Sequence, residues 1–125
     1  MKFHHLGIVC KDIKKSLVEL EKIYDVDTIS NIVYDSNQDA EVCLIETSNG
    51  INIELISGNR VSGLLKKGIT YYHCCYLTTD IETEIIRLKK EGALVVIPPR
   101  KAPLFNYKNV SFLFTPHGLI ELLEE

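Results

Sequence analysis

The hydrophobic and polar positions of the first half predict a strand, a helix and three further strands. The apolar run at 5–9 reads as a strand, and Asp12 after it is a preferred helix N-cap residue. The apolar positions that follow have helical spacing, at Ile13, Leu17, Leu20 and Tyr24. Three shorter alternating segments then predict strands at 28–33, 41–47 and 51–56.

The second half shows the same order of signals. A strand is predicted at 73–77, Asp80 is placed to cap a helix, and Gly92 is placed to end it in a left-handed conformation. The apolar stripe of this helix is Ile81, Ile85 and Leu88. Three further strands are predicted at 94–97, 110–115 and 119–123. In each half a dipeptide predicts a hairpin turn before the last strand, Asn49-Gly50 and His117-Gly118.

The two halves also match residue by residue. An offset of 68 positions carries His5 onto His73 and Asp12 onto Asp80. One residue then drops out, after which the triplet 53–55, Ile-Glu-Leu, matches the identical triplet at 120–122. The sequence therefore predicts an α+β fold of two tandem βαβββ modules, 1–57 and 70–125, joined by a connecting segment at 58–69. We expect one domain over 1–125, a curved mixed-sheet cup with the helices on the outside.

One long irregular stretch is predicted at 97–108, where three of the four prolines lie. Long loops in compact domains are often functional, so this stretch is the candidate substrate lid.

Composition narrows the classes of function. With 125 residues, 46% hydrophobic and 25% charged, the chain suits a soluble globular domain. A net charge of −3 offers no basic surface for nucleic acid or for an anionic membrane. No apolar run reaches signal-peptide length or the roughly 20 residues of a membrane span, so we expect a cytoplasmic protein. The four cysteines lack CxxC spacing and are expected to be reduced thiols packed as small hydrophobic groups.

Strand alternation places candidate ligands together. Asn52, Glu54 and Ile56 share one face of a strand, while the residues between them share the other. If the helices cover the apolar face, two histidines and two carboxylates can converge in the cup, from His5, Glu54, His73 and Glu121. Imidazole and carboxylate donors suit a divalent first-row metal that keeps open positions for substrate oxygens.

Each of these four residues also has an ordinary interpretation. A histidine on a strand is commonly a hydrogen-bonded structural residue, and a glutamate on a half-exposed strand commonly faces water. A duplicated ancestor could also have left the same residues in both halves. The recurrence of one His and one Glu at nearly the same spacing favours the metal site.

The chain resembles the vicinal oxygen chelate superfamily, which includes glyoxalase I, methylmalonyl-CoA epimerase, extradiol dioxygenases and bleomycin resistance proteins. The resemblance lies in the paired modules, the first strand "HLGIV", the mid-chain "YHCCYLTTDI" and the closing "GLIELLE". It implies metal ligands at His5, Glu54, His73 and Glu121, with His4 the less suitable histidine of its pair. Glu121 would also act as the base, and Zn, Ni, Co and Mn stay open as the metal.

The chain departs from the pattern of epimerase-like sequences at one pair of residues. Sequences similar to the epimerase usually carry a Glu-Gln pair shortly before the strand that here begins at Val42, and that Glu serves as a second acid/base group. This chain has Asn37 and Gln38 instead. A two-base epimerase would need Asp35, Asp39 or Glu41.

Substrate contacts are assigned to five residues with less specific signals. Tyr71 and Cys75 share the strand face of His73, and filling the cup wall is an equally good interpretation of both. Asn52, Arg100 and Tyr107 are the other candidates, and solvated surface charge is the alternative for an arginine. The expected partner is a small molecule with adjacent oxygens, and we expect a homodimer whose sites lie within one chain or between two.

The predicted function is a metal-dependent lyase or isomerase that shifts a proton next to a carbonyl. The alternatives are methylmalonyl-CoA epimerase proper and a ligand-sequestering protein similar to the bleomycin resistance proteins. A dioxygenase is disfavoured, because such relatives typically carry two histidines and one carboxylate.

Overall fold

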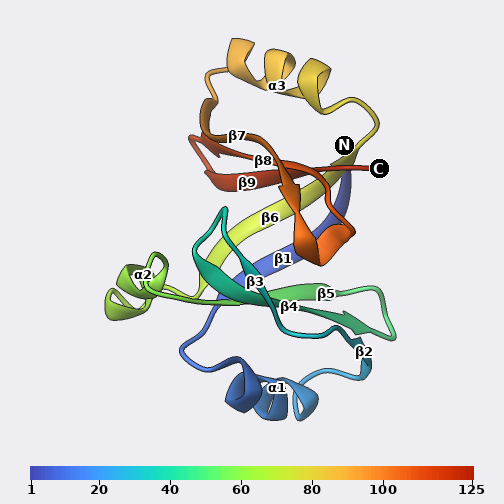
Figure 1. The fold of residues 1–125 in the computed structure, drawn as a ribbon, viewed down its shortest axis with the longest axis vertical. Coiled ribbons are helices and arrows are strands. Elements are labelled where there is room, and N and C mark those ends of the chain that lie inside the picture. The colour runs from blue at the N-terminus through green and yellow to red at the C-terminus, as the bar shows by residue number, and fades with distance from the viewer. The chain divides into compact units, whose positions relative to one another are not determined.

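The computed structural model describes residues 1–125 and contains nine strands, three α-helices and one short 3-10 helix (Figure 1). The chain forms two compact units. Residues 5–72 make up the N-terminal unit, and residues 73–125 together with 1–4 make up the C-terminal unit. Each unit combines a mixed sheet with helices, so the α+β class is confirmed. The βαβββ order recurs in both halves, with one additional short strand in the N-terminal unit.

The N-terminal unit contains the first seven elements, except that residues 2–4 of the first strand belong to the C-terminal unit. The seven elements are β1 (Lys2–Val9), α1 (Ile13–Glu21), β2 (Val26–Ile29), β3 (Val33–Asp35), β4 (Ala40–Thr47), β5 (Asn52–Ser57) and α2 (Ser62–Lys66). The strand order is β2-β4-β5-β1, and β3 also pairs with β4. Strand β4 is antiparallel to β2, β3 and β5, whereas β1 and β5 are parallel.

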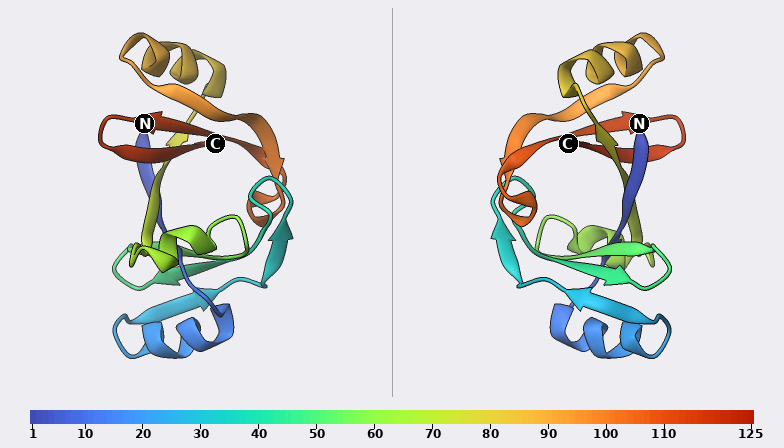
Figure 2. Two further views of the ribbon diagram at one scale, coloured as in Figure 1. Left: turned by 90° about the vertical axis from the view of Figure 1, so that its left-hand side faces the viewer. Right: turned by 90° about the vertical axis from the view of Figure 1, so that its right-hand side faces the viewer.

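Helix α1 begins and packs as its sequence predicts. The Asp12 carboxylate accepts a hydrogen bond from the Lys15 N–H at 3.3 Å, which satisfies one of the free donors of the first turn. The helix lies along one face of its sheet (Figure 2). Its apolar stripe and the strands form one core cluster that includes Ile13, Leu17, Leu20, Tyr24, Cys43, Ile45, Ile53 and Leu55.

The C-terminal unit repeats this design with β6 (Tyr71–Thr78), α3 (Ile81–Lys90), β7 (Leu94–Ala102), the 3-10 helix η1 (Pro103–Phe105), β8 (Lys108–Thr115) and β9 (Gly118–Glu124). The strand order is β6-β9-β8-β7, with β6 parallel to β9. Asp80 caps α3, and Gly92 follows it with φ +97°. Helix α3 packs on one sheet face with Leu113 and Leu122, and a second apolar cluster lies on the other, including Cys75, Val110 and Phe112.

The irregular conformation predicted for 97–108 is wrong, whereas the role of this stretch as a substrate lid stays a prediction. Strand β7 continues through this stretch to Ala102, and only 103–107 lie between β7 and β8. The register of β7 on β8 shifts on both sides of Ile97, and the prolines at 98 and 99 lie in the second shift. Because β7 is the last strand of its order, a bulged edge accommodates residues that have no N–H to donate.

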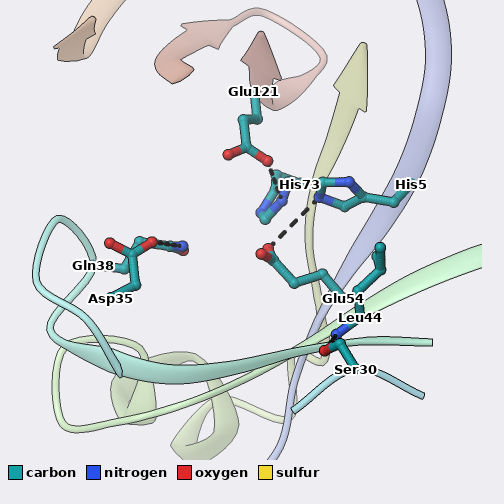
Figure 3. Close-up of polar contacts among 8 residues, drawn as sticks. All are labelled: His5, Ser30, Asp35, Gln38, Leu44, Glu54, His73 and Glu121. Carbon is teal, nitrogen blue, oxygen red and sulfur yellow. Dashed lines mark hydrogen bonds and ion pairs between the residues drawn. The ribbon is translucent and has the colours of Figure 1, made fainter. Parts of the chain in front are cut away.

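Two smaller predictions also need correction. The strand predicted at 28–33 is two strands, β2 and β3, separated by residues 30–32. Ser30 replaces part of the ladder, because its hydroxyl accepts from the Leu44 N–H at 2.8 Å (Figure 3). The connecting segment 58–69 contains α2, whose five residues are too few to give a periodic signal.

The cysteines are free thiols, and Cys10, Cys43 and Cys75 are buried in the core clusters as expected. Burial raises the pKa of the Cys10 and Cys43 thiols, and nearby negative charge adds to the effect, which keeps them neutral. None of the helices has both the length and the apolar character needed to cross a bilayer.

Candidate functional site

His5 and Glu54 form a buried pair in the N-terminal unit. Nε2 of His5 lies 3.6 Å from Oε1 of Glu54, and both side chains are almost fully buried (Figure 3). Gly7 is the register partner of Glu54 across the parallel β1–β5 ladder, and His5 shares the face of Gly7. The pair therefore lies on the sheet face opposite α1.

His73 and Glu121 form the corresponding pair in the C-terminal unit. Nε2 of His73 lies 3.2 Å from Oε1 of Glu121, again with both side chains buried (Figure 3). Phe112, the register partner of Glu121 on β8, meets the His73 ring edge to face with centroids 5.2 Å apart. This aromatic contact restrains the imidazole on the sheet face opposite α3.

The two pairs are built in the same register. In β1 the residue two positions after the histidine, Gly7, pairs with Glu54, and in β6 the residue two positions after the histidine, Cys75, pairs with Glu121. Both ladders are parallel. The sequence repeat is therefore a repeat of side-chain geometry within each unit.

The donor atoms of each pair fit adjacent positions around one divalent ion. Metal–nitrogen and metal–oxygen bonds of about 2.1 Å separate two ligand atoms by about 3.0 Å in an octahedron and about 3.4 Å in a tetrahedron. The separations of 3.2 and 3.6 Å are close to this range. A buried histidinium–carboxylate pair would instead carry the desolvation cost of two ions.

The Glu54 face of the N-terminal unit contains two further buried polar residues. Register pairs Asp35 with Ala40, which shares the face of Val42, and Val42 pairs with Ile56 beside Glu54. Gln38 lies in the turn after Asp35, and its Nε2 donates to Asp35 Oδ2 at 2.9 Å (Figure 3). Both residues are buried. No sequence signal indicated Asp35 or Gln38 as a residue of this face, because a turn separates β3 from β4 and strand alternation does not continue through it.

The other carboxylates considered near this turn have different surroundings. Asp39 is exposed and accepts a hydrogen bond from the Tyr34 hydroxyl, which raises the pKa of Tyr34. Glu41 is exposed as well. The Asn37 N–H donates to Asp35 Oδ1 at 2.9 Å, and its carbonyl accepts from Arg60 at 3.0 Å.

The five predicted substrate-contact residues lie in different environments. Cys75 is fully buried beside Glu121 in the register of β6 and β9. Tyr71 is 70% exposed and Tyr107 is 66% exposed, Arg100 is exposed on β7, and Asn52 is half-buried at the start of β5. Their role in substrate binding stays a prediction.

Most of the chain matches one protein-family model. The model of the glyoxalase/bleomycin resistance protein/dioxygenase superfamily matches residues 4–114. Among curated proteins, none matches the chain.

Several solved structures have a similar fold. One is methylmalonyl-CoA epimerase from Mycobacterium tuberculosis, with a TM-score of 0.81, 18% identity, and coverage of 98% of this chain and 87% of that one. Another is a variant of Streptomyces coelicolor methylmalonyl-CoA epimerase in complex with 2-nitronate-propionyl-CoA, with a TM-score of 0.80, 20% identity, and coverage of 100% and 97%. A hypothetical protein from Bacillus halodurans has a TM-score of 0.74, 20% identity, and coverage of 99% and 94%.

Proposed function

Because the chain belongs to the glyoxalase/bleomycin resistance protein/dioxygenase superfamily, known also as the vicinal oxygen chelate superfamily, we propose that it is a metal-dependent isomerase of the epimerase type. It would move a proton at the carbon next to a carbonyl. The observation that carries the proposal is the pair of buried His–Glu contacts built in one register in both units.

In this proposal the two pairs act together as ligands of one divalent ion. His5, Glu54 and His73 hold the ion, and Glu121 is both a ligand and the base. Bound there, the ion would act as a Lewis acid for two adjacent substrate oxygens and stabilise the charge that develops on removal of the α-proton. Zn, Ni, Co and Mn all suit this set of nitrogen and oxygen donors.

The chain's own residues supply the proton transfer and the dry surroundings. Glu121 takes the α-proton and, after the planar enolate turns over, returns it to the opposite face of the same carbon, while Phe112 and Cys75 keep the strand face of Glu121 apolar. Exclusion of water strengthens every electrostatic interaction with the developing enolate. Asn52, Tyr71, Arg100 and Tyr107 are proposed to contact more distant parts of the substrate.

The substrate is proposed to be an acyl thioester with a carboxylate or carbonyl that places a second oxygen next to the first. Structures of similar fold are described as methylmalonyl-CoA epimerase with methylmalonyl-CoA or with 2-nitronate-propionyl-CoA bound. Those ligands carry such paired oxygens, and we extend that substrate class to this chain.

A glyoxalase-like lyase is the second candidate, and the environment of residue 37 favours it. Asn37 cannot carry a proton, Asp39 and Glu41 are exposed, and both oxygens of Asp35 accept hydrogen bonds from its own turn. One base on one side of the substrate suits proton transfer between neighbouring carbons. Epimerisation is more efficient with a base on each side.

The deciding experiment compares Glu121→Gln with Glu54→Gln. Metal content and α-proton exchange in D₂O are measured with methylmalonyl-CoA and with the hemithioacetal of a 2-oxoaldehyde. Glu121→Gln should retain some metal, because an amide oxygen still coordinates weakly. Its exchange rate should fall by about 10²- to 10⁴-fold, the usual contribution of a general base.

The control variant, Glu54→Gln, should act mainly through metal affinity, and its exchange should recover as metal is added. Exchange at the parent rate in Glu121→Gln would show that Glu121 is not the base and that the proposal places the base in the wrong unit. Binding of both compounds by the parent protein without exchange of either would instead indicate a sequestering protein.

A further inference from the structure

The turn between β3 and β4 carries a buried amide oxygen that accepts no hydrogen bond from the protein. Gln38 is 2% exposed, and its Oε1 has no donor within hydrogen-bond distance. Most buried polar side-chain atoms in proteins have a partner. An exception on the same sheet face as Glu54 calls for a chemical explanation.

Asp35 determines which way this amide points. Gln38 Nε2 donates to Asp35 Oδ2 at 2.9 Å, and Asp35 Oδ1 accepts from the Asn37 N–H, so both oxygens of Asp35 act as acceptors. The reverse orientation of the amide would bring two acceptor oxygens together. Asp35 therefore holds the nitrogen of Gln38 toward itself and leaves the oxygen available for a donor from elsewhere.

The turn itself is held in place by the segment that follows β5. A Cβ at Gly58 would lie 2.5 Å from the Asp39 carbonyl oxygen, so only glycine permits this approach of the two backbones. Arg60 Nη1 donates to the Asn37 carbonyl at 3.0 Å. The Asn37 N–H completes the turn by donating to Asp35 Oδ1. Gln38 thus lies on a preorganised support.

We propose that Gln38, oriented by Asp35, accepts a hydrogen bond from an O–H or N–H group in the tail of the ligand that binds on the Glu54 face. The inference rests on the proposed function, because it assigns a second contact to the substrate of that same site. It gives Gln38 a binding role and makes Asp35 a positioning residue.

The register shows why the donor belongs to the tail. Asp35 pairs with Ala40 and Glu54 pairs with Leu44, so four residues of β4, or about 13 Å, separate the two positions along the strand. This is the separation of the backbone positions, and a compact chelating head at Glu54 is shorter than it. A thioester whose tail contains amide and hydroxyl groups spans it.

The test measures equilibrium binding by calorimetry, in the presence of Co²⁺, for two probes with the same head. Methylmalonyl-CoA carries N–H and O–H donors in its tail, and the S-ethyl thioester of methylmalonate carries none. Gln38→Leu should weaken binding of methylmalonyl-CoA by about tenfold, the size of one net hydrogen bond, and leave the short thioester unchanged.

Asp35→Asn gives an independent check without loss of volume. The new amide can donate to Gln38 Oε1 and turn the Gln38 amide round, so the same selective loss is expected. This isosteric variant decides the matter if Gln38→Leu does not fold. Ser36→Ala, at an exposed position of the same turn, is the matched control and should bind both probes as the parent does.

Equal loss for both probes would show that the turn only supports the site, and parent-like binding in both variants would show that Oε1 serves no ligand. Either result overturns the inference, as does a parent protein that binds neither probe. Because binding is measured apart from exchange, a parent that binds selectively but exchanges no α-proton contradicts the proposed reaction and leaves the contact of Gln38 supported.

Discussion

Single side chains in this protein derive their chemistry from the strand register in which they lie. Glu54 and Glu121 occupy ordinary alternating strands, yet each is buried within 3.6 Å of a histidine nitrogen. A glutamate on a half-exposed strand would face water, and burial without compensation would be costly. Each glutamate is a candidate metal ligand because the parallel ladder holds it next to a buried histidine.

Asn37→Ala tests whether residue 37 has a chemical role. Two of its contacts in the turn are made by backbone atoms, the N–H toward Asp35 and the carbonyl toward Arg60, and both persist in alanine. We therefore expect kcat and KM within about threefold of the parent values, on the scale of surface substitutions. A loss of several orders of magnitude in kcat would show that the amide takes part in the reaction.

Asp80 should contribute to the pH dependence of stability. Hydrogen bonds from the Thr83 N–H and hydroxyl lower the pKa of Asp80, so the folded protein favours its ionised form. This contribution is present above the unfolded pKa of about 3.9 and is lost as pH falls through the lower folded value. Urea unfolding between pH 6 and pH 3 should show a weaker acid dependence for Asp80→Asn, which keeps the cap and cannot titrate. An unchanged slope would contradict this assignment.

At the scale of elements, the edge strands show how local sequence signals are overridden. The prolines at 98 and 99 indicate a loop, but β7 tolerates them because it is bulged and has no strand on its far side within its order. The turn between β3 and β4 shows the opposite case, in which close packing gives a short loop a defined shape.

Gly58→Ala should test that packing. The added Cβ would meet backbone atoms of Asp39 and Ala40 at 2.5 and 2.8 Å, and backbone atoms cannot move aside as a flexible side chain can. We expect a loss of about 1–3 kcal/mol in the free energy of unfolding, typical of overpacking. Weaker binding of methylmalonyl-CoA should accompany it if Gln38 is displaced.

Gly63→Ala is the matched control for urea unfolding. Nothing lies within 4 Å of its Cβ position in α2, so alanine should leave stability unchanged or raise it by up to about 1 kcal/mol. Equal stability of the two variants would contradict the close approach at Gly58.

At the scale of the whole molecule, the repeat predicts the number of ions bound. If both His–Glu pairs serve one ion, Co²⁺ titration should give one ion per chain. His5→Ala and His73→Ala should then each weaken that single binding event, because either change removes a ligand of the same ion. Removal of the ion by chelation should lower Tm, since metal binds the folded state preferentially.

Two ions per chain, with each variant losing only one of them, would contradict the shared site. If both variants bind cobalt more weakly and the protein sediments as a dimer, the next experiment mixes His5→Ala chains with His73→Ala chains. Recovery of cobalt binding in the mixture would show that the site is shared between chains.

The sequence alone determined the features that depend on local chemistry and periodicity. Asp12 and Asp80 predicted both helix starts, Gly92 predicted a left-handed helix end, and alternation separated Glu54 from Ile53 and Leu55. These follow from hydrogen-bonding capacity, backbone freedom and strand geometry, which belong to the residues themselves.

Tertiary structure decided what depends on partners distant in sequence. It extended β7 through the prolines, because an edge strand does not require every N–H, and it placed the Asp35–Gln38 turn beside Gly58 on the Glu54 face. The sequence of the turn does not predict the register of β4 on β5. That register arises only when the strands pair, and it sets which buried polar groups share a face.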